Sequence, residues 1–217
     1  VRTVASAAGL TVRGEVGDIR VGRIVQRKER DLRFLRRLAN EYGYTFNVRD
    51  KVITFLRTAE LENANAVASF EKSDLMNYSI RDKSTGIYKL ATIKYHNPLT
   101  SETITHTEGE GGLDDTDDTL ELLYTAESKA QAIEMTKEAL RAANRLQQSG
   151  NITLPGTALL CAGNVIELTG LGFLSGNYII KSSAHTIGIS EGWLVDAEVY
   201  KVGYVDESKL KPKKDDA

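Results

Sequence analysis

The chain of 217 residues is poor in cysteine and proline and has no long apolar run. Cys161 is the only cysteine, which excludes an internal disulfide and any zinc site built from cysteines. Three prolines beside 18 glycines exclude collagen-like and proline-rich linker proteins. No apolar run approaches the roughly 18–20 residues that span a bilayer, so we expect no membrane insertion.

The start of the chain also lacks an initiator methionine and an export signal. The first residue is Val1, and no charged-then-apolar segment precedes the first periodic stretch. We therefore expect part of a longer protein, or a trimmed one, that is made and used without export through a membrane.

Charge divides the chain into two modules, although the formal net charge is only −2. Residues 1–58 hold 13 Lys and Arg against 6 Asp and Glu, whereas residues 59–217 hold 15 against 24. A basic module favours either nucleic acid or an acidic protein partner. Its arginines are spread along predicted helix and strands with few aromatic residues between them. We therefore expect no sequence-specific binding of nucleic acid.

The first module, residues 1–58, is predicted to be a small α+β domain. Within residues 29–42, leucines recur at helical spacing, and Gly43 follows as a stop. The predicted buried stripe contains Leu32, Leu35 and Leu38. Arg36 and Arg37 lie off this stripe and are interpreted as a solvated helix face.

Short segments on either side of this helix complete the first module. Residues 1–8 are alanine-rich and are predicted to form a helix that Gly9 ends. Residues 44–48 and 52–56 alternate around the turn-like Arg-Asp-Lys tripeptide, which predicts a hairpin packed under the main helix. Residues 57–69 are interpreted as a polar linker.

Residues 59–208 are predicted to form a mostly antiparallel β-barrel domain with one long helix. Short strand-like segments separated by Gly-, Asn- and Ser-containing turns are typical of a barrel or sandwich. In the last segment Trp193, Val195, Ala197 and Val199 share one face, which predicts burial on one side only. The predicted strands are residues 75–81, 88–96, 102–107, 120–124, 158–161, 165–168, 178–187 and 193–202. Residues 209–217 are predicted to be a flexible tail.

The long helix is predicted over residues 127–148, with Gly150 as its stop. Good helix formers fill it, and a narrow apolar stripe runs along it. The stripe comprises Ala126, Ala130, Ile133, Leu140, Ala143 and Leu146. A narrow stripe flanked by charge fits a helix that lies on a barrel wall, or alternatively one that meets a partner helix; we favour the barrel wall.

Residues 108–118 carry six carboxylates among glycines. Such a cluster has three interpretations: a calcium site, an acid–base pair, or a mobile solvated loop. The glycines precede the acids and no acid falls at the closing position, so the spacing does not match a calcium-binding loop. We therefore favour the mobile loop.

Residues typical of catalysis are few and scattered. His96, His106 and His185 lie far apart and form no helix-borne metal-binding pair. Cys161 falls in an apolar segment that predicts a small buried side chain rather than a nucleophile. Neither a nucleophile elbow nor a phosphate-binding loop is present. We expect no enzyme activity, no cofactor and no metal.

The C-terminal third contains a glycine-rich pattern whose residues follow a defined order. Gly163 precedes an alternating strand, a Gly-x-Gly turn follows, and then come Gly-x-Tyr-x-Ile and a histidine. The residues that carry this pattern are Gly163, Gly170, Gly172, Gly176, Tyr178, Ile180 and His185. It resembles the late control D family of phage tail proteins, which is related to the hub part of type VI secretion VgrG spikes. The helix of residues 30–44 is similar to the helix that follows the first barrel of this family.

The resemblance implies a structural hub of two barrels flanking a small α+β domain, assembled as a homotrimer. Six barrels would then adapt a sixfold tail tube, or its initiator protein, to a threefold central spike. The first barrel is missing here and is expected before Val1. The implied location is the baseplate of a virion tail or tail-like particle, assembled in the bacterial cytoplasm. The alternative is a tail-associated module that degrades cell wall or binds glycans through the acidic segment.

Overall fold

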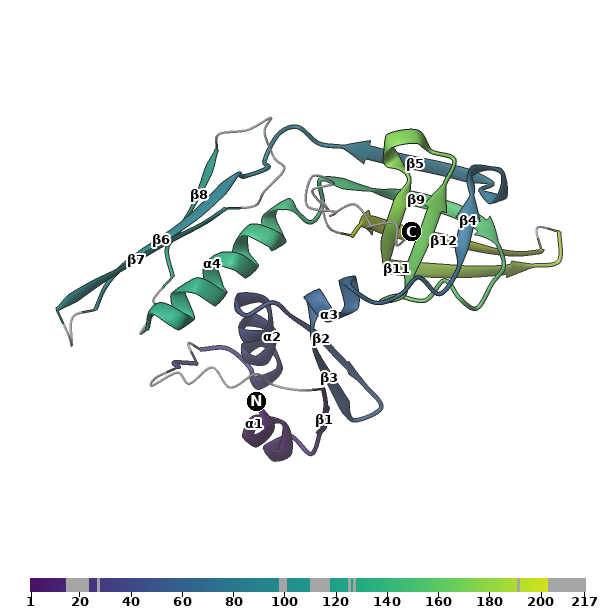
Figure 1. Cartoon of the computed structure of the whole chain (residues 1–217). Helices are drawn as coiled ribbons and strands as arrows, with labels where there is room; N and C mark the ends of the chain where they lie inside the picture. The colour runs from purple at the N-terminus through teal and green to yellow at the C-terminus, as the bar shows by residue number, and fades with distance from the viewer. Residues whose placement is uncertain are drawn as a thin grey trace, which may run out of the picture.

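The computed structural model describes residues 1–14, 24–26, 28–97, 101–109, 118–124, 126, 128–190 and 192–202. It has a mixed α+β fold in which three sheets surround one long helix, α4 (Figure 1). The predicted tail, residues 209–217, lies outside the described residues, as do residues 110–117 of the acidic segment. The predicted fold class, α+β with one long helix, is confirmed.

The N-terminal unit is a three-stranded sheet, ordered β1-β3-β2, with two helices. Its elements are α1 (Arg2–Ala7), β1 (Thr11–Arg13), α2 (Asp31–Glu41), β2 (Tyr44–Arg49) and β3 (Val52–Arg57). The predicted hairpin is present as β2 and β3. Asp50 and Lys51 adopt positive φ of 50° and 62°, which allows the tight turn between two antiparallel strands.

Helix α2 packs on this sheet with a buried face that differs in part from the predicted stripe. Leu35 and Leu38 are buried, together with Phe34 and Ala39, but Leu32 is 41% exposed. The prediction for Leu32 is therefore wrong. At 100° per residue, Leu32 lies about 90° from the centre of the buried arc, because Phe34 shifts that centre away from it.

The arginine face of α2 is more engaged than predicted. Arg37 forms ion pairs with Glu29 at 2.8 Å and with Glu41 at 2.9 Å. Arg36 lies 5.8 Å from the ring centroid of Phe46, so it packs over an aromatic face. Arg36 is exposed, as predicted, whereas Arg37 is partly buried between its two carboxylate partners.

The largest sheet has six strands in the order β4-β10-β11-β12-β9-β5 and curls into a half-barrel. Its neighbours are antiparallel except for β4 and β10, which are parallel. The strands are β4 (Ser69–Glu71), β5 (Asn77–Asp82), β9 (Gln148–Pro155), β10 (Val165–Thr169), β11 (Gly176–Gly188) and β12 (Gly192–Lys201). On β12, Val195, Ala197 and Val199 are buried in the half-barrel core as predicted, whereas Trp193 is 41% exposed.

Three predicted strands do not join the barrel. They are β6 (Leu90–Asn97), β7 (Glu102–Gly109) and β8 (Thr119–Leu122), and they form a separate sheet ordered β7-β6-β8. In Figure 1 this sheet lies on the far side of α4 from the half-barrel. Ile93, Leu122, Ala126 and Ala132 form its small core against α4. The described residues of the range 59–208 therefore build two sheets rather than one.

Helix α4 runs from Lys129 to Asn144, shorter than the predicted 127–148. The Ser128 hydroxyl caps it by accepting a hydrogen bond from the Gln131 amide at 3.2 Å. Its buried residues are Gln131, Ala132, Met135, Thr136, Glu138, Leu140 and Asn144. The predicted narrow stripe is correct in part: Ala126 and Leu140 are buried, whereas Ala130 and Leu146 are exposed. Because α4 packs against both the three-stranded sheet and the N-terminal unit, it is buried on two sides.

Several local predictions also differ from the structure. Residues 158–161 form a turn rather than a strand, and Cys161 is exposed. The predicted linker contains a short helix, α3 (Thr58–Glu62), and ends where β4 begins. Gly150 lies inside β9 rather than ending a helix, because a Cβ there would collide with the backbone of Ser79 on β5. In the sequence alone, a glycine that is required by the close approach of a neighbouring strand looks the same as a glycine that ends a helix.

Candidate assembly surface

The four motif glycines share a backbone conformation that other residues rarely adopt. Their φ angles are +92° at Gly163, +74° at Gly170, +63° at Gly172 and +139° at Gly176. Three of them shape the connection from β10 to β11, which includes the short 3₁₀ helix Gly172–Leu174. Glycine is favoured at these positions because a Cβ is strained in the left-handed region. Turn geometry thus explains why glycine occupies these four positions.

Tyr178 braces this turn from inside the half-barrel. Its ring is fully buried, and its hydroxyl donates a hydrogen bond of 2.6 Å to the carbonyl oxygen of Leu174. Burial raises the pKa of Tyr178 to about 12, so its hydroxyl remains protonated at neutral pH. Lys201 donates a second bond, of 2.9 Å, to the carbonyl of Phe173. The two bonds hold Phe173 outward, where it is 75% exposed.

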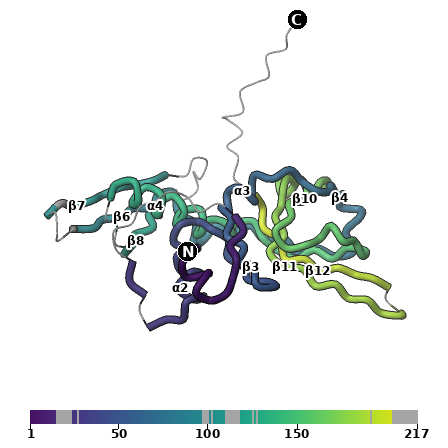
Figure 2. The backbone as a smooth tube through the Cα atoms, turned by 90° about the horizontal axis from the view of Figure 1, so that it is seen from below, coloured from purple at the N-terminus to yellow at the C-terminus, as the bar shows by residue number. Residues whose placement is uncertain are grey.

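Strands β11 and β12 extend beyond the rest of the half-barrel as a two-stranded arm. Strand β10 pairs with β11 only between Gly176 and Ile179, whereas β11 and β12 remain paired to Gly188 and Gly192. Figure 2 shows this pair projecting from the half-barrel. We define the arm as residues 182–190, 192 and 193, along which β11 has no outer neighbour in the described part of the chain; from Leu194 onward, β12 pairs with β9. Among the described residues, no strand pairs with the outer edge of β11 in the arm.

The end of the arm carries an exposed apolar cluster, the arm tip, formed by Ile187, Ile189 and Trp193. Ile187 is 79% exposed, Ile189 is fully exposed and Trp193 is 41% exposed. Ile187 and Trp193 are directly paired across the strands and share the face that buries Val195 further along β12. The core face of the half-barrel therefore continues outward onto Trp193, which is partly covered, and Ile187, which is largely uncovered among the described residues.

Trp193 is held in a defined position at the base of this cluster. Its indole lies over Gly156, where a Cβ would collide with the ring. Its ring nitrogen donates to Nδ1 of His185 at 3.3 Å. Exposed apolar side chains that are gathered on a rigid element are typical of a protein interface. The arm tip is thus the strongest candidate for a binding surface in the part of the chain that the structure describes.

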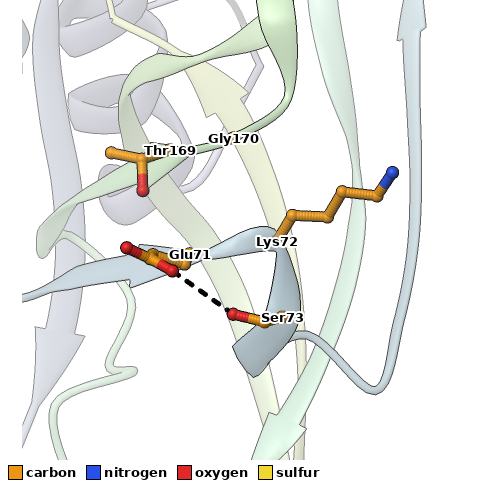
Figure 3. Close-up of a pocket in the computed structure, with 5 residues that line it drawn as sticks. All are labelled: Glu71, Lys72, Ser73, Thr169 and Gly170. Carbon is orange, nitrogen blue, oxygen red and sulfur yellow. Dashed lines mark hydrogen bonds between the residues drawn. The ribbon is translucent and has the colours of Figure 1, made fainter.

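Two open hollows lie near one end of the half-barrel. The first, of about 610 Å³, is lined by Glu71, Lys72, Ser73, Thr169 and Gly170 (Figure 3). The Ser73 hydroxyl donates to the Glu71 carboxylate at 3.4 Å, and Lys72 points away from both. Its polar groups therefore do not converge on one point, as those of an active site would. The second hollow, of about 650 Å³, has a mixed lining that includes Phe70, Leu75, Met76 and Pro155.

The three histidines lie in three separate places. His96 contacts Thr103 at 3.2 Å, His106 contacts Glu108 at 3.1 Å, and His185 lies on the arm. Among the described residues, no group of three His, Cys, Asp or Glu side chains could hold a metal ion. Within those same ranges, no helix is long and apolar enough to cross a membrane.

The structure gathers most of the motif residues but separates His185 from them. Gly170, Gly172, Gly176 and Tyr178 surround the turn between β10 and β11, whereas His185 lies out on the arm beside Trp193. The arm tip was not predicted, because Ile187 and Trp193 fit the alternation of an ordinary buried strand. The sequence signal for an overhang is the longer predicted strand 178–187 beside the short predicted strand 165–168; in the structure β11 has 13 residues and β10 has five.

A network of polar contacts joins α4 to the N-terminal unit. The side-chain amide of Gln131 donates a hydrogen bond of 2.8 Å to the Tyr42 hydroxyl, and Arg57 forms an ion pair of 3.6 Å with Glu134. On the neighbouring α3, Glu62 accepts from Arg145 at 2.9 Å. These partners are far apart in sequence, so no local pattern predicts them. We call this network the joint.

The sequence matches no protein-family model and no curated protein. The structure, however, resembles several solved structures across most of the chain. A tail protein from Neisseria meningitidis MC58 is similar with a TM-score of 0.69 and 11% identity, covering 92% of this chain and 64% of that protein. The 43 kDa tail protein of prophage MuSo2 from Shewanella oneidensis has a TM-score of 0.71 and 13% identity, covering 92% and 65%.

A third similar structure is the E. coli c3393 protein, described as a type VI secretion component with structural similarity to the phage T4 tail proteins gp27 and gp5. It has a TM-score of 0.50 and 12% identity, covering 90% of this chain and 44% of that protein. This chain thus spans less than two thirds of the length of each of the three proteins. At these identities, the similarity establishes a fold shared with phage tail proteins.

Proposed function

We propose that the chain is part of a structural hub at the baseplate of a contractile phage tail or a tail-like injection particle. The observation that carries this proposal is the fold, which matches two tail proteins over 92% of the chain. The order of the motif glycines and Tyr178 supports the late control D family in particular. The scattered histidines and the divergent polar groups of the hollow at Glu71 favour a structural role over a catalytic one.

Assembly of the hub requires surfaces that other subunits cover, and the arm fits that requirement. An unpaired strand edge offers backbone donors and acceptors to a neighbouring chain. The apolar arm tip adds burial energy beside that edge. We propose that a second copy of this chain covers the arm, by a contact in which the arm of one copy meets a different surface of the next. Contacts of this head-to-tail kind close into a ring when the rotation between neighbouring copies divides a full turn evenly, as it does in a trimer.

The proposed ring is a homotrimer in which each chain contributes two barrels, and the half-barrel described above is the second. The matched tail proteins are longer than this chain, which leaves room in them for a further domain. Six barrels around one axis would match a sixfold tail tube on one side and a threefold spike on the other. The role is mechanical, requires no cofactor and places the protein in the virion tail.

Light scattering on two lengths of the protein tests this proposal. The protein at its natural length, with any preceding barrel, is expected to be a trimer, alone or with its spike partner. Residues 1–217 alone are expected to be monomeric or weakly associated, because half of the barrel contacts are absent and association entropy is no longer offset. A natural-length protein that stays monomeric even with its spike partner would refute the hub proposal.

A further inference from the structure

Glu138 is a buried carboxyl group at the contact between α4 and the N-terminal unit. The residue is 5% exposed, and its Oε2 atom has no hydrogen-bond partner among the described residues. Its other oxygen, Oε1, lies 3.5 Å from the guanidinium of Arg141, a partly exposed side chain. Leaving a buried charge without a full set of partners is costly. Glu138 is therefore an unusual residue in an otherwise well-paired helix.

The backbone of the N-terminal unit lies directly against this carboxylate. Gly43, just after α2, has φ of +70°, and a Cβ there would collide with the carboxylate of Glu138. The carbonyl oxygen of Gly43 accepts a 2.8 Å hydrogen bond from the amide of Thr58, so the segment is fixed from its other side. The charge state of Glu138 thus affects a point of direct contact between α4 and the N-terminal unit.

Charged and titratable groups face Glu138 from several elements. Arg141 and Arg145 on α4 attract a negative carboxylate, whereas Glu134 on α4 and Glu62 on α3 repel it. Arg57 at the end of β3 adds a further positive charge, and it is occupied with Glu134 and with the ring of Tyr44. The arginines are thus shared among three carboxylates and do not neutralise Glu138 fully.

We propose that Glu138 makes the joint between α4 and the N-terminal unit sensitive to protonation. The joint is closed when the carboxyl group carries a proton and loosens when it ionises. In the closed state the neutral carboxyl packs against Gly43 without the cost of a buried charge. In the ionised state the uncompensated charge favours entry of water between Gly43 and α4. This proposal does not depend on the hub function.

The direction of the effect follows from the pKa of Glu138. Burial is the main cause that raises this pKa above the ordinary value, and the two nearby carboxylates add to it, although Arg141 and Arg145 oppose it. The folded protein therefore holds the proton more tightly than the unfolded chain does. The contribution to stability is fully present below the carboxyl pKa of the unfolded chain, about 4.3. It is lost as the pH rises through the folded value.

Thermal unfolding of residues 1–217 between pH 4 and pH 8 tests the proposal, with wild type compared against Glu138→Gln. The amide keeps the size of the side chain but cannot ionise. We expect the stability of the wild type relative to Glu138→Gln to fall by several degrees as the pH rises. Glu167→Gln is the control, since Glu167 is an exposed glutamate on β10 of the half-barrel and takes no part in the joint. It should leave the pH dependence of the wild type in place.

Hydrogen exchange locates the effect. The amides of residues 42–45 and of α4 near residue 138 should exchange faster at pH 8 than the intrinsic rate increase explains, in the wild type but not in Glu138→Gln. Amides in the half-barrel should show no such difference. Equal pH dependence of wild type and Glu138→Gln, in both melting and local exchange, would overturn the proposal. Failure of the hub proposal would leave this test unaffected, since it concerns the single chain.

Discussion

The half-barrel and the three-stranded sheet β7-β6-β8 are stabilised in different ways. The half-barrel encloses a continuous apolar core, whose ten buried members include Ile152, Ile166, Leu168 and Ile180. In the described residues, the β7-β6-β8 sheet contributes Ile93 and Leu122 to a small apolar cluster with Ala126 and Ala132, and it also buries the small side chain of Ala91. Polar α4 residues complete the contact, among them Asn144, which bonds both backbone groups of Tyr88 at 2.8 and 2.9 Å.

This difference indicates a division of work between the two regions. A sheet with its own apolar core keeps its shape whatever binds it, because burial supplies most of the stabilising free energy. A sheet that relies on a shared helix and a few directed hydrogen bonds opens at lower cost. We therefore expect the half-barrel to be the rigid part of the chain, and the three-stranded sheet with α4 to be the part that responds to local change.

Truncation of a large core side chain should have the largest effect on the free energy of unfolding, and it should differ between the two sheets. Ile166→Ala in the half-barrel should cost ~2–5 kcal/mol, because the surrounding strands cannot collapse into the cavity. Ile93→Ala in the three-stranded sheet is equally buried but should fall near the lower end of that range, since its few neighbours can relax. Urea unfolding of both variants measures the two costs. A larger cost for Ile93→Ala would contradict the proposed division.

Loss of the Asn144 side chain should show how much one polar anchor contributes to the free energy of unfolding. Asn144→Ala leaves the backbone N–H and C=O of Tyr88 without their partner, which should cost ~1–3 kcal/mol. Native-state hydrogen exchange should report the loss in β6 and α4, while the half-barrel amides stay protected. Uniform loss of protection in all three sheets would mean that the chain opens as one unit.

Removal of the Tyr178 hydroxyl should have a smaller effect. Tyr178→Phe keeps the ring in the half-barrel core but removes the bond to Leu174, at a cost of ~0.5–1.5 kcal/mol by chemical denaturation. Its pKa is raised to about 12, so its contribution to stability is lost as the pH rises from the ordinary tyrosine value of ~10 towards 12. The variant should therefore lose less stability over that range than the wild type. If Tyr178→Phe lost as much stability as the wild type over this pH range, the alkaline loss of stability would belong to another group, such as Tyr200.

The sequence predicts elements whose signal is local. The hairpin at Asp50 and Lys51, the end of α1 at Gly9 and the turns at Gly170 and Gly172 each depend on a few neighbouring residues, and all are present. The alternation of Val195, Ala197 and Val199 likewise predicts the buried face of β12.

Features that depend on distant contacts were missed. Helix α4 is buried on two sides, so its periodicity does not show one clean stripe, and Glu138 resembles any solvated acid in sequence. Gly150 resembles a helix stop until β5 is placed against it. The arm tip shows the same alternation as a core strand, and only the early end of β10 distinguishes the two. Tertiary context decides each of these cases.

The most direct measurement of the hub account is the mass of the natural-length protein, by light scattering, with Ile187→Ser and Ile189→Ser introduced together on the arm tip. Burial of one isoleucine contributes ~1.5–3 kcal/mol, so each change should weaken self-association about tenfold or more. Both side chains are exposed in the single chain, so its melting temperature should not change. The account predicts trimers for the wild type and dissociation for the double variant at equal concentration. Trimers of undiminished stability in the double variant would contradict the assignment of the arm as the assembly surface.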